Sequence, residues 1–510
     1  MSTIGREETT VSRAVSRDRG RDAVRPQVRS DATKGLTLDV KRLRNDFPAL
    51  QSERNGKPLV YFDNASLTLK PVQVIAAMDR YYYTFPACGG RGRSRHFFSK
   101  RVVWATDGNG DEFRTDEGST VDPGYTWLEI EGAREKVRKL INARAPGEIV
   151  FTRNTTESLN LVARGFHFRP GAVVLTTDRE HNSNLCPWRE LERAGVIRHL
   201  AVPSNADNTF DLDRYRAMLA EHKVQLVSMV HTANLDGYTI PAREITRLAH
   251  ERGARVMLDA AQSAAHTTLD VQQLDVDFLA FSVHKMCGPT GMGILYGKFE
   301  VLQGLDPFIV GGDTVSDTFL DAPPVYLEPP YRFEAGLQNF AGIIGTGAAA
   351  DYLRGIGMES IAAHESELNR FVTEGLADLR DEFDIFGPED PSLRGGITNL
   401  CSKRRGLVRV PRARFLEVAG HMWDVTGPKS TRADAQVVGL DELLNGWSNI
   451  MVRSGLFCAH SWFHARNISP ERQTARVSLY FYNTLDECRS FLETLHRIVR
   501  FPEYQALKRV

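Results

Sequence analysis

DFLAFSVHKMCGPTGMGILY, from Asp277 to Tyr296, carries the strongest structural signal in the sequence. It predicts a short apolar strand that ends at His284 and Lys285, a glycine-rich turn and a second apolar run. A lysine at the end of a buried strand is costly unless it has a partner or a chemical role. One such role is a Schiff base with an aldehyde cofactor, because an amine in a dry pocket is activated for that reaction. A surface lysine in a loop fits this stretch equally well.

The composition argues against several classes of protein. The chain has 510 residues, too many for one small core, so we expect two domains with tails. Acidic and basic side chains balance at 64 each, so no net field points to nucleic acid or to an anionic membrane. No apolar run is long enough to span a bilayer. The six cysteines are sparse and show no CxxC spacing, which argues against a disulfide framework or a ribbon-type zinc site and favours a reducing cytoplasm.

Strands and helices alternate on the N-terminal side of this stretch. EIVFT, AVVLTT, VQLVSMV and RVMLDAA are near-continuous apolar runs, and helical segments such as PAREITRLAHERG lie between them. This pattern predicts a largely parallel sheet with helices on both faces. The C-terminal part of the chain predicts a smaller α+β domain. The polar N-terminus lacks the apolar core of a signal peptide, so we expect a disordered tail there.

Polar residues gather at the predicted carboxyl ends of these strands, where parallel sheets bind their ligands. A pyridoxal phosphate site needs a Schiff-base lysine and an acid opposite the ring nitrogen, and Lys285 and Asp259 are placed to supply them. Its phosphate needs donors at a helix N-terminus, and Thr155 and Thr156 open a helix directly after a strand. His181 ends the next strand and can stack on the ring. Each residue alone fits better as a turn, cap or loop residue, but the four in this order at strand ends favour the cofactor site.

At these positions the sequence resembles the class V, fold-type I pyridoxal-phosphate enzymes, and among them the Suf-type cysteine desulfurase and selenocysteine lyase group. The resemblance runs, with gaps, from about Leu38 to the C-terminus. It rests on the segments VYFDNAS, EGAREKVRKLINA, IVFTRNTTESLNLVA, REHNSNLCPW, HTANLDGYTIP, LDAAQSAAH, DFLAFSVHKMCGPTGMGILYG, RFEAGLQNFAGIIG, VRSGLFCAH and RVSLYFYNT. These motifs are specific in combination.

The resemblance implies the domain organisation of a fold-type I transferase in the α/β class. After a tail over residues 1–37, a large cofactor-binding domain with a mostly parallel seven-stranded sheet covered by helices would span 38–335. A smaller C-terminal α+β domain would span 336–510 and carry the Cys458 loop. The first part of the large domain, about 38–70, is a candidate for packing with the small domain instead.

The resemblance also implies a role for each residue around the cofactor. Lys285 would bind the aldehyde of pyridoxal 5'-phosphate and then move the Cα proton of the substrate, with His181 stacked on the ring. Asp259 would pair with the pyridinium nitrogen, and Gln262 would hydrogen-bond the ring hydroxyl. The cofactor phosphate would be held by Thr155, Thr156, Ser282 and His284.

Cys458 separates a desulfurase from the wider class. In the family pattern RxGxxC, the cysteine attacks the substrate sulfur, so that a persulfide forms and alanine leaves. The thiolate is the reactive form, and Arg453 is a candidate for the cation that favours it. One alternative is a buried structural cysteine. Another is a zinc ligand together with His460 and His464, although the surrounding sequence does not suit a closed structural zinc site. The substrate would be bound by Asn234, Arg453 and Arg476, with the planar guanidinium of Arg476 as the clamp for its carboxylate.

Several positions depart from the family pattern. The family's usual Gly is Asn154 here, and its usual second His is Asn182. The two residues before the cysteine, often both His, are Leu456 and Phe457. The family's Thr that would reach a phosphate across the dimer is Leu337. The segments 107–126 and 402–447 have the character of insertions. These departures keep a second hypothesis open, a class V lyase, epimerase or cyclase that acts on another amino acid. A cofactor-bound scaffold is a third, against which the intact Lys285 argues. The resemblance implies L-cysteine or a related amino acid as substrate and a homodimer with its active sites at the interface, and it leaves a sulfur-acceptor protein open.

Overall fold

The computed structural model describes residues 38–54, 56–84, 86, 126–411, 435–469 and 471–510. The tail expected over 1–37 and, apart from Thr126, the acidic loop expected over 107–126 lie outside the described residues. The unit Thr37–Val510 is compact as a whole. The domain boundary expected at residue 335 therefore stays a prediction.

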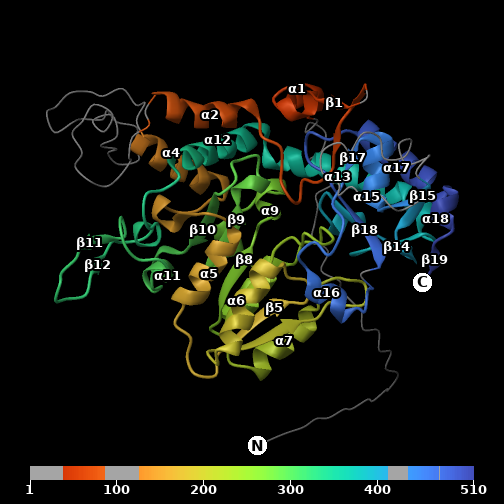
Figure 1. Ribbon diagram of the computed structural model, residues 1–510. Coiled ribbons are helices and arrows are strands. Elements are labelled where there is room, and N and C mark those ends of the chain that lie inside the picture. Colours follow the sequence, from red (N-terminus) through yellow and green to blue (C-terminus); the bar gives the residue numbers. More distant parts are fainter. Residues whose placement is uncertain (1–37, 55, 85, 87–125, 412–434, 470) are drawn as a thin grey trace, which may run out of the picture. The chain divides into compact units, whose positions relative to one another are not determined.

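A seven-stranded sheet forms the centre of this unit (Figure 1). Its strands, in spatial order, are β4 (Ile149–Thr152), β10 (Gly293–Gly297), β9 (Phe278–Ser282), β8 (Arg255–Asp259), β7 (Val224–Val230), β5 (Val173–Thr177) and β6 (Arg198–Val202). The strands from β9 to β6 pair in parallel, whereas β10 runs antiparallel to both of its neighbours. This arrangement confirms the predicted, mostly parallel sheet. Strand β6 was not predicted, because its sequence RHLAV lies at the sheet edge and combines exposed with buried residues and polar with apolar ones.

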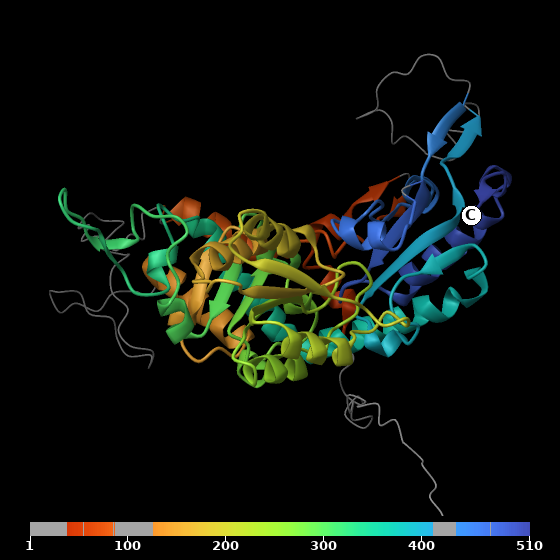
Figure 2. The same ribbon diagram turned by 90° about the horizontal axis from the view of Figure 1, so that it is seen from below.

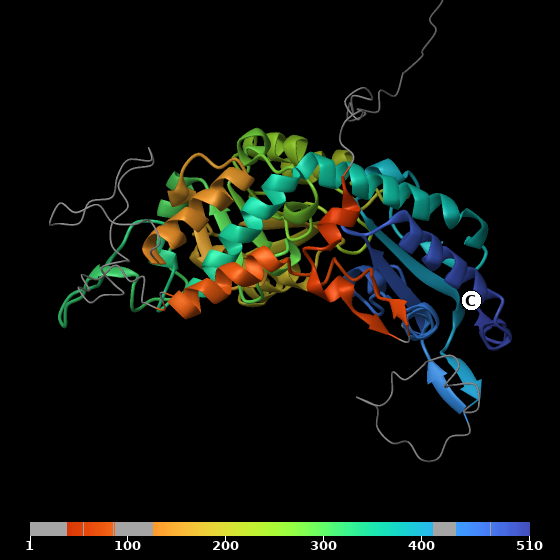
Figure 3. The same cartoon turned by 90° about the horizontal axis from the view of Figure 1, so that it is seen from above.

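Helices cover both faces of the sheet, since consecutive strand residues point to opposite sides and both sides are apolar. Met257 packs in the layer under α5 (Thr155–Gly165), α6 (Asn182–Arg193) and α11 (Phe299–Gln303). Its neighbour Leu258 packs in the opposite layer. That layer contains α2 (Val72–Thr84), α4 (Thr126–Leu140), α7 (Leu212–Glu221), α8 (Ala242–His250) and α12 (Phe340–Ile356). In the view from above, α12 lies beside α2 and α4, with which it is in contact (Figure 3).

A second, antiparallel sheet lies in the C-terminal part of the chain. It consists of β13 (Phe383–Ile385), β14 (Ile397–Arg405), β18 (Arg472–Ser478) and β19 (Lys508–Arg509). Its core includes residues of α13 (Met358–Gly375), α15 (Leu440–Ser448), α17 (Leu485–Val499) and α18 (Pro502–Gln505). Within the expected insertion 402–447, β15 (Val408–Pro411) and β16 (Ala435–Val438) form a separate ribbon that projects from this sheet (Figure 2).

The N-terminal segment joins this second sheet region. Strand β3 (Val60–Tyr61) pairs in parallel with β17 (Ile450–Met451), and Asp63 forms a bridge to Ser478 at the end of β18. Segment 38–70 thus contacts the C-terminal part of the chain, as the resemblance allowed. The other short elements are α1 (Val40–Arg44), β1 (Glu53–Arg54), β2 (Lys57–Pro58), α9 (Ser263–His266), α10 (Val271–Leu274), β11 (Val315–Asp317), β12 (Val325–Tyr326) and α16 (His460–Ala465). None of the described helices combines the length and the apolar character needed to cross a membrane.

Candidate active site

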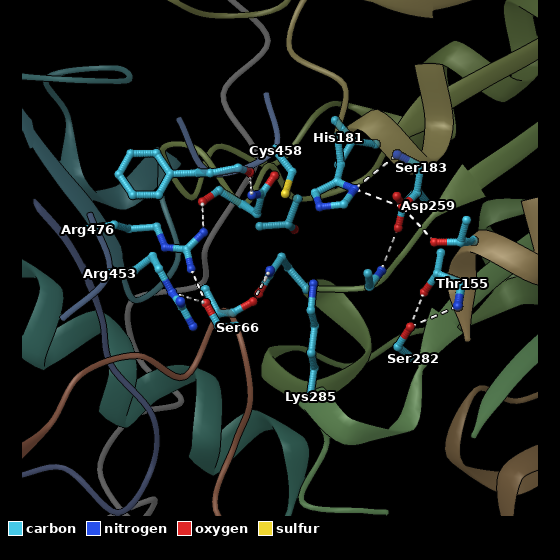
Figure 4. Close-up of a pocket in the computed structure, with 18 of the residues that line it drawn as sticks. Ser66, Thr155, His181, Ser183, Asp259, Ser282, Lys285, Arg453, Cys458 and Arg476 are labelled. Carbon is cyan, nitrogen blue, oxygen red and sulfur yellow. Dashed lines mark hydrogen bonds between the residues drawn. The ribbon is translucent and has the colours of Figure 1, made fainter. Parts of the chain in front are cut away.

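A cavity of about 610 Å³ opens at the carboxyl ends of the parallel strands. Strands β8 and β9 end at its wall with Asp259 and Ser282, and the C-terminal part of the chain closes it from the other side with Arg476 (Figure 4). Every residue predicted for the site lines this one cavity: Thr155, Thr156, His181, Asn234, Asp259, Gln262, Ser282, His284, Lys285, Arg453, Cys458 and Arg476. The fold therefore brings together residues that are more than 300 positions apart in the sequence.

Lys285 follows β9 in a short 3-10 turn and points into the cavity (Figure 4). The segment before α2 stabilises this turn. The carbonyl oxygen of His284 accepts hydrogen bonds from the Lys70 amine at 2.9 Å and from the Thr68 backbone N–H at 3.1 Å. Burial lowers the pKa of the Lys285 amine from 10.5 to about 8, against the opposing effect of the Asp259 carboxylate. The amine is therefore neutral, and nucleophilic, at a lower pH than an ordinary lysine.

This shift predicts the pH dependence of Lys285 reactivity in protein without cofactor. Because only the neutral amine reacts, its acylation rate should rise with pH and level off above about 8, instead of near the ordinary lysine value of 10.5. Competitive labelling with a trace of acetic anhydride, read by mass spectrometry of the Lys285 peptide, measures this midpoint. The exposed Lys57 serves as the reference in the same digest. A rate for Lys285 that is still climbing steeply at pH 10 would contradict the expectation.

Asp259 and His181 line the same cavity, and burial shifts their pKa values in opposite directions. Asp259 is buried, and its carboxylate accepts a hydrogen bond from the Ala261 backbone at 2.9 Å. Burial raises the pKa of Asp259, so a cation or N–H donor in the cavity would stabilise its charged form. Burial lowers the pKa of His181 to about 4, and the nearby Lys285 and Arg476 add to this effect. His181 is therefore a neutral ring at neutral pH.

The tautomer of His181 follows from its hydrogen bonds. Its Nδ1 accepts the backbone N–H of Ser183 at 3.1 Å, so the ring proton is assigned to Nε2. The Ser183 hydroxyl also lies 3.0 Å from Nδ1 and 2.7 Å from the hydroxyl of Thr156. Ser183 thus connects His181 with the start of α5, a role that the sequence did not indicate.

Hydroxyl groups and a helix N-terminus meet at one corner of the cavity, a set of donors that suits an anion. The Ser282 hydroxyl lies 2.8 Å from the backbone nitrogen of Thr155 and 2.6 Å from its side-chain oxygen. Asn154 caps α5 by accepting the Glu157 backbone N–H at 2.9 Å, so asparagine takes the place of the usual glycine there as a helix cap. This turn presses against β10, where a Cβ on Gly293 would lie 2.5 Å from the Cα of Asn154. Helix N-termini of this kind bind phosphate groups.

Two arginines lie next to each other on the opposite wall. Arg453 and Arg476 are joined by backbone hydrogen bonds, and both side chains donate to the Ser66 hydroxyl, at 3.2 and 2.7 Å. Asp63 lies 2.8 Å from Arg453 and 3.5 Å from Arg476. Burial lowers the pKa of Arg476 to about 10, with Asp63 acting in the opposite direction. Asp63 and Ser66 belong to the VYFDNAS segment, which is part of the family resemblance but for whose residues no role was predicted.

Cys458 lies in the loop between β17 and α16, with an exposed side chain, and Figure 4 shows it next to His181. A negative charge on its sulfur would raise the pKa values of Lys285 and Arg476. The guanidinium of Arg453, which the sequence favoured as the cation beside the thiol, is bonded to Asp63 instead. Lys285 and Arg476 line the same cavity as Cys458 and are further candidates for that cation.

The substituted flank of Cys458 has an apolar environment. Phe457 is buried with Trp462 and Phe463, and its ring lies 5.1 Å from the guanidinium carbon of Arg476. Leu456 also lines the cavity. Leu337, by contrast, is 70 % exposed and lies outside the cavity of this chain.

The cavity fits pyridoxal phosphate. Three buried polar atoms in its wall have no partner among the described residues, namely Oδ1 of Asn234, Oε1 of Gln262 and Nε of Arg476. Buried polar atoms are normally paired, so these atoms indicate a polar ligand. The donor set completes the fit, with an amine for the aldehyde, a carboxylate for the ring nitrogen and hydroxyls at a helix N-terminus for the phosphate.

Comparisons with known proteins agree with this site. The family model described as aminotransferase class-V matches residues 123–406. A probable cysteine desulfurase of Synechocystis sp. is 38 % identical over 467 residues, which cover 90 % of this chain and 95 % of the relative. A cysteine desulfurase of Dickeya dadantii is 34 % identical, with 90 % and 97 % covered. The apo structure of a cysteine desulfurase from Thermococcus onnurineus NA1 superimposes with a TM-score of 0.72 at 31 % identity, covering 90 % of this chain and 98 % of that one.

Proposed function

The chain belongs to the class-V aminotransferase family, whose members use pyridoxal 5'-phosphate, and we propose that it is a cysteine desulfurase. The observation that carries the proposal is one cavity lined by the Lys285 amine, the Arg476 guanidinium and the Cys458 thiol. The relatives named cysteine desulfurase support it over nearly their whole length. In this proposal L-cysteine is converted to L-alanine, and its sulfur passes to Cys458 as a persulfide.

Pyridoxal phosphate, when bound, supplies an electron sink for negative charge at the substrate Cα. Lys285 would hold its aldehyde, Asp259 its ring nitrogen and His181 the face of the ring. Gln262 would meet the ring hydroxyl. Its phosphate would be held by Thr155, Thr156, Ser282 and His284, and the hydroxyl of Ser183 extends this set.

The remaining residues would act on the substrate. Arg476 binds the carboxylate, for which its unpartnered Nε–H is available, and Arg453 adds charge at the mouth of the cavity. Once the substrate amine has replaced the Lys285 amine on the cofactor aldehyde, the free Lys285 amine takes the Cα proton. Cys458, as the thiolate, then attacks the substrate sulfur, so that an S–S bond forms while the C–S bond breaks. The electron pair of the C–S bond stays with the carbon skeleton, which is protonated and leaves as alanine, so no external oxidant or reductant is needed.

A second function keeps the cofactor and changes the substrate. Leu456 and Phe457 make the flank of Cys458 apolar, where the family pattern has two histidines. Fewer polar groups at this flank suit an amino acid with an apolar side chain. In this alternative the protein is a class V lyase, epimerase or cyclase, and Cys458 has no covalent role.

A cysteine desulfurase of this family would need partners and a suitable compartment. We expect a homodimer, because apolar side chains near β11 are exposed: Phe308, Ile309, Val310, Phe319 and Leu320. A sulfur-acceptor protein is expected as the partner that removes the persulfide. A reducing, cytoplasmic compartment agrees with the five described cysteines, all of which are free thiols.

A panel of amino acids tests the proposal against its alternative. We expect kcat/KM for L-cysteine to exceed that for any other standard amino acid by at least about tenfold, with alanine as the product. Purified protein loaded with pyridoxal phosphate is incubated with each amino acid, and products are identified by mass spectrometry. Faster turnover of an apolar amino acid, with cysteine left intact, would reject the desulfurase and support the second function.

A further inference from the structure

The loop that carries Cys458 has an unfavourable backbone conformation. Phe457 and Cys458 both have positive φ angles, 50° and 55°. The left-handed region is costly for residues with a Cβ, and two such residues in succession are uncommon. Such a conformation persists only where the surrounding structure holds it. The contacts of this loop should therefore include the groups that impose it.

Two asparagines hold the carbonyl groups of these two residues. The side-chain amide of Asn234 donates to the Phe457 carbonyl oxygen at 2.8 Å. The backbone N–H of Asn182 donates to the Cys458 carbonyl oxygen at 2.7 Å. Asn234 follows β7 and Asn182 begins α6, so both belong to the part of the fold that contains the seven-stranded sheet. These bonds tie the thiol loop to the wall that carries His181 and Lys285.

Asn182 makes a second contact with the same loop. Its side-chain nitrogen lies 3.0 Å from Nδ1 of His460, two residues beyond the thiol. The other end of the loop is fixed within the C-terminal part, since the Thr474 hydroxyl bonds both the N–H and the carbonyl of Gly455, at 3.0 and 2.7 Å. The bond from the Ala459 N–H to the Leu456 carbonyl is local. Asn182 therefore holds the loop at the backbone of the residue that carries the thiol.

We propose that Asn182 is a positioning residue, whose backbone N–H holds Cys458 in the left-handed conformation and so sets the place of the thiol relative to Lys285 and His181. Asn234 supports the same conformation one residue earlier. The catalytic part of this inference rests on the proposed function. Attack on the substrate sulfur depends on the placement of the thiol, and a displacement of about 1 Å can cost roughly 100-fold in rate.

A matched pair of variants isolates the backbone bond. Asn182→Ala keeps the N–H and removes the side-chain contact with His460. Asn182→Pro removes the N–H as well. Proline is compatible with this position, because Asn182 is the first residue of α6 and the preceding His181 is extended, with φ −62° and ψ 146°. The difference between the two variants therefore reports on the bond to the Cys458 carbonyl.

The first readout is hydrogen exchange in the protein loaded with pyridoxal phosphate. We expect faster exchange in the 455–460 peptide of Asn182→Pro than in that of Asn182→Ala, with exchange in the rest of α6 and the cofactor absorbance unchanged. The second readout is single-turnover alanine release from L-cysteine. It should be at least about tenfold slower in Asn182→Pro than in Asn182→Ala, with KM within about twofold.

Each outcome decides a separate point. Equal loop exchange in the two variants would overturn the inference, and so would a looser loop in Asn182→Pro with undiminished alanine release. If the unmodified protein makes no alanine from cysteine, the proposed function fails, and the exchange measurement still decides whether Asn182 holds the loop. Should Asn182→Pro not fold, Asn234→Asp replaces it. That variant removes the donor to the Phe457 carbonyl at constant size and should loosen the same peptide.

Discussion

Lys285→Ala is expected to lower the turnover of L-cysteine by more than about 1,000-fold. The substitution removes the amine that would hold the cofactor and the base that would take the Cα proton, and no other lysine lines the cavity among the described residues. The purified variant should also lack the absorbance of pyridoxal phosphate bound covalently to a lysine. Steady-state alanine formation and the absorbance spectrum measure the two effects in one preparation.

Lys298→Ala is the matched control for this substitution. Lys298 is bonded to Asp275 at 2.6 Å, away from the cavity, and its loss should leave turnover within about twofold of the unmodified protein. Activity that persists in Lys285→Ala would show that another group performs the chemistry, and the assignment of this cavity would then be wrong.

Cys458→Ala is expected to reduce alanine release from L-cysteine by about 1,000-fold or more, because it removes the nucleophile that receives the sulfur. The cofactor spectrum should be unchanged, since Cys458 has no part in holding pyridoxal phosphate in the proposed mechanism. Binding of L-cysteine, followed by the change in that spectrum, should persist as well. The variant therefore separates substrate binding from sulfur transfer.

The control for Cys458 is a second exposed thiol. Cys186, on α6, is exposed like Cys458 but does not line the cavity. Cys186→Ala should retain alanine release within about twofold. If Cys458→Ala releases alanine from L-cysteine at the rate of Cys186→Ala, the persulfide mechanism is excluded, because the sulfur then leaves the substrate without passing to Cys458.

The strands of the central sheet could be predicted because a strand buried on both faces has a nearly continuous apolar sequence. Runs such as RVMLDAA and FLAFSV are typical of strands buried on both sides, and they lead directly to Asp259 and Lys285. The apolar pattern of strand β6 is weaker, since an edge strand buries only part of its surface. The ribbon of β15 and β16 lies inside a segment that the sequence indicated only as an insertion.

The supporting residues of the site could not be predicted, because their roles depend on contacts between distant segments. Asp63 and Ser66 meet Arg453 and Arg476 across about 390 to 410 positions of sequence. No local pattern marks a carboxylate that will face two arginines. Asn182 appeared only as a departure from the family pattern, and the bond from its backbone to Cys458 depends on tertiary structure alone.

A single turnover with one equivalent of L-cysteine tests the persulfide mechanism most directly. The protein loaded with pyridoxal phosphate is quenched, alanine is quantified, and the peptide that contains Cys458 is analysed by mass spectrometry without reduction. We predict one alanine for each Cys458 peptide that has gained one sulfur atom, and no gain on the Cys186 peptide. Alanine without added sulfur on the Cys458 peptide, or cysteine recovered unchanged, would contradict this mechanism.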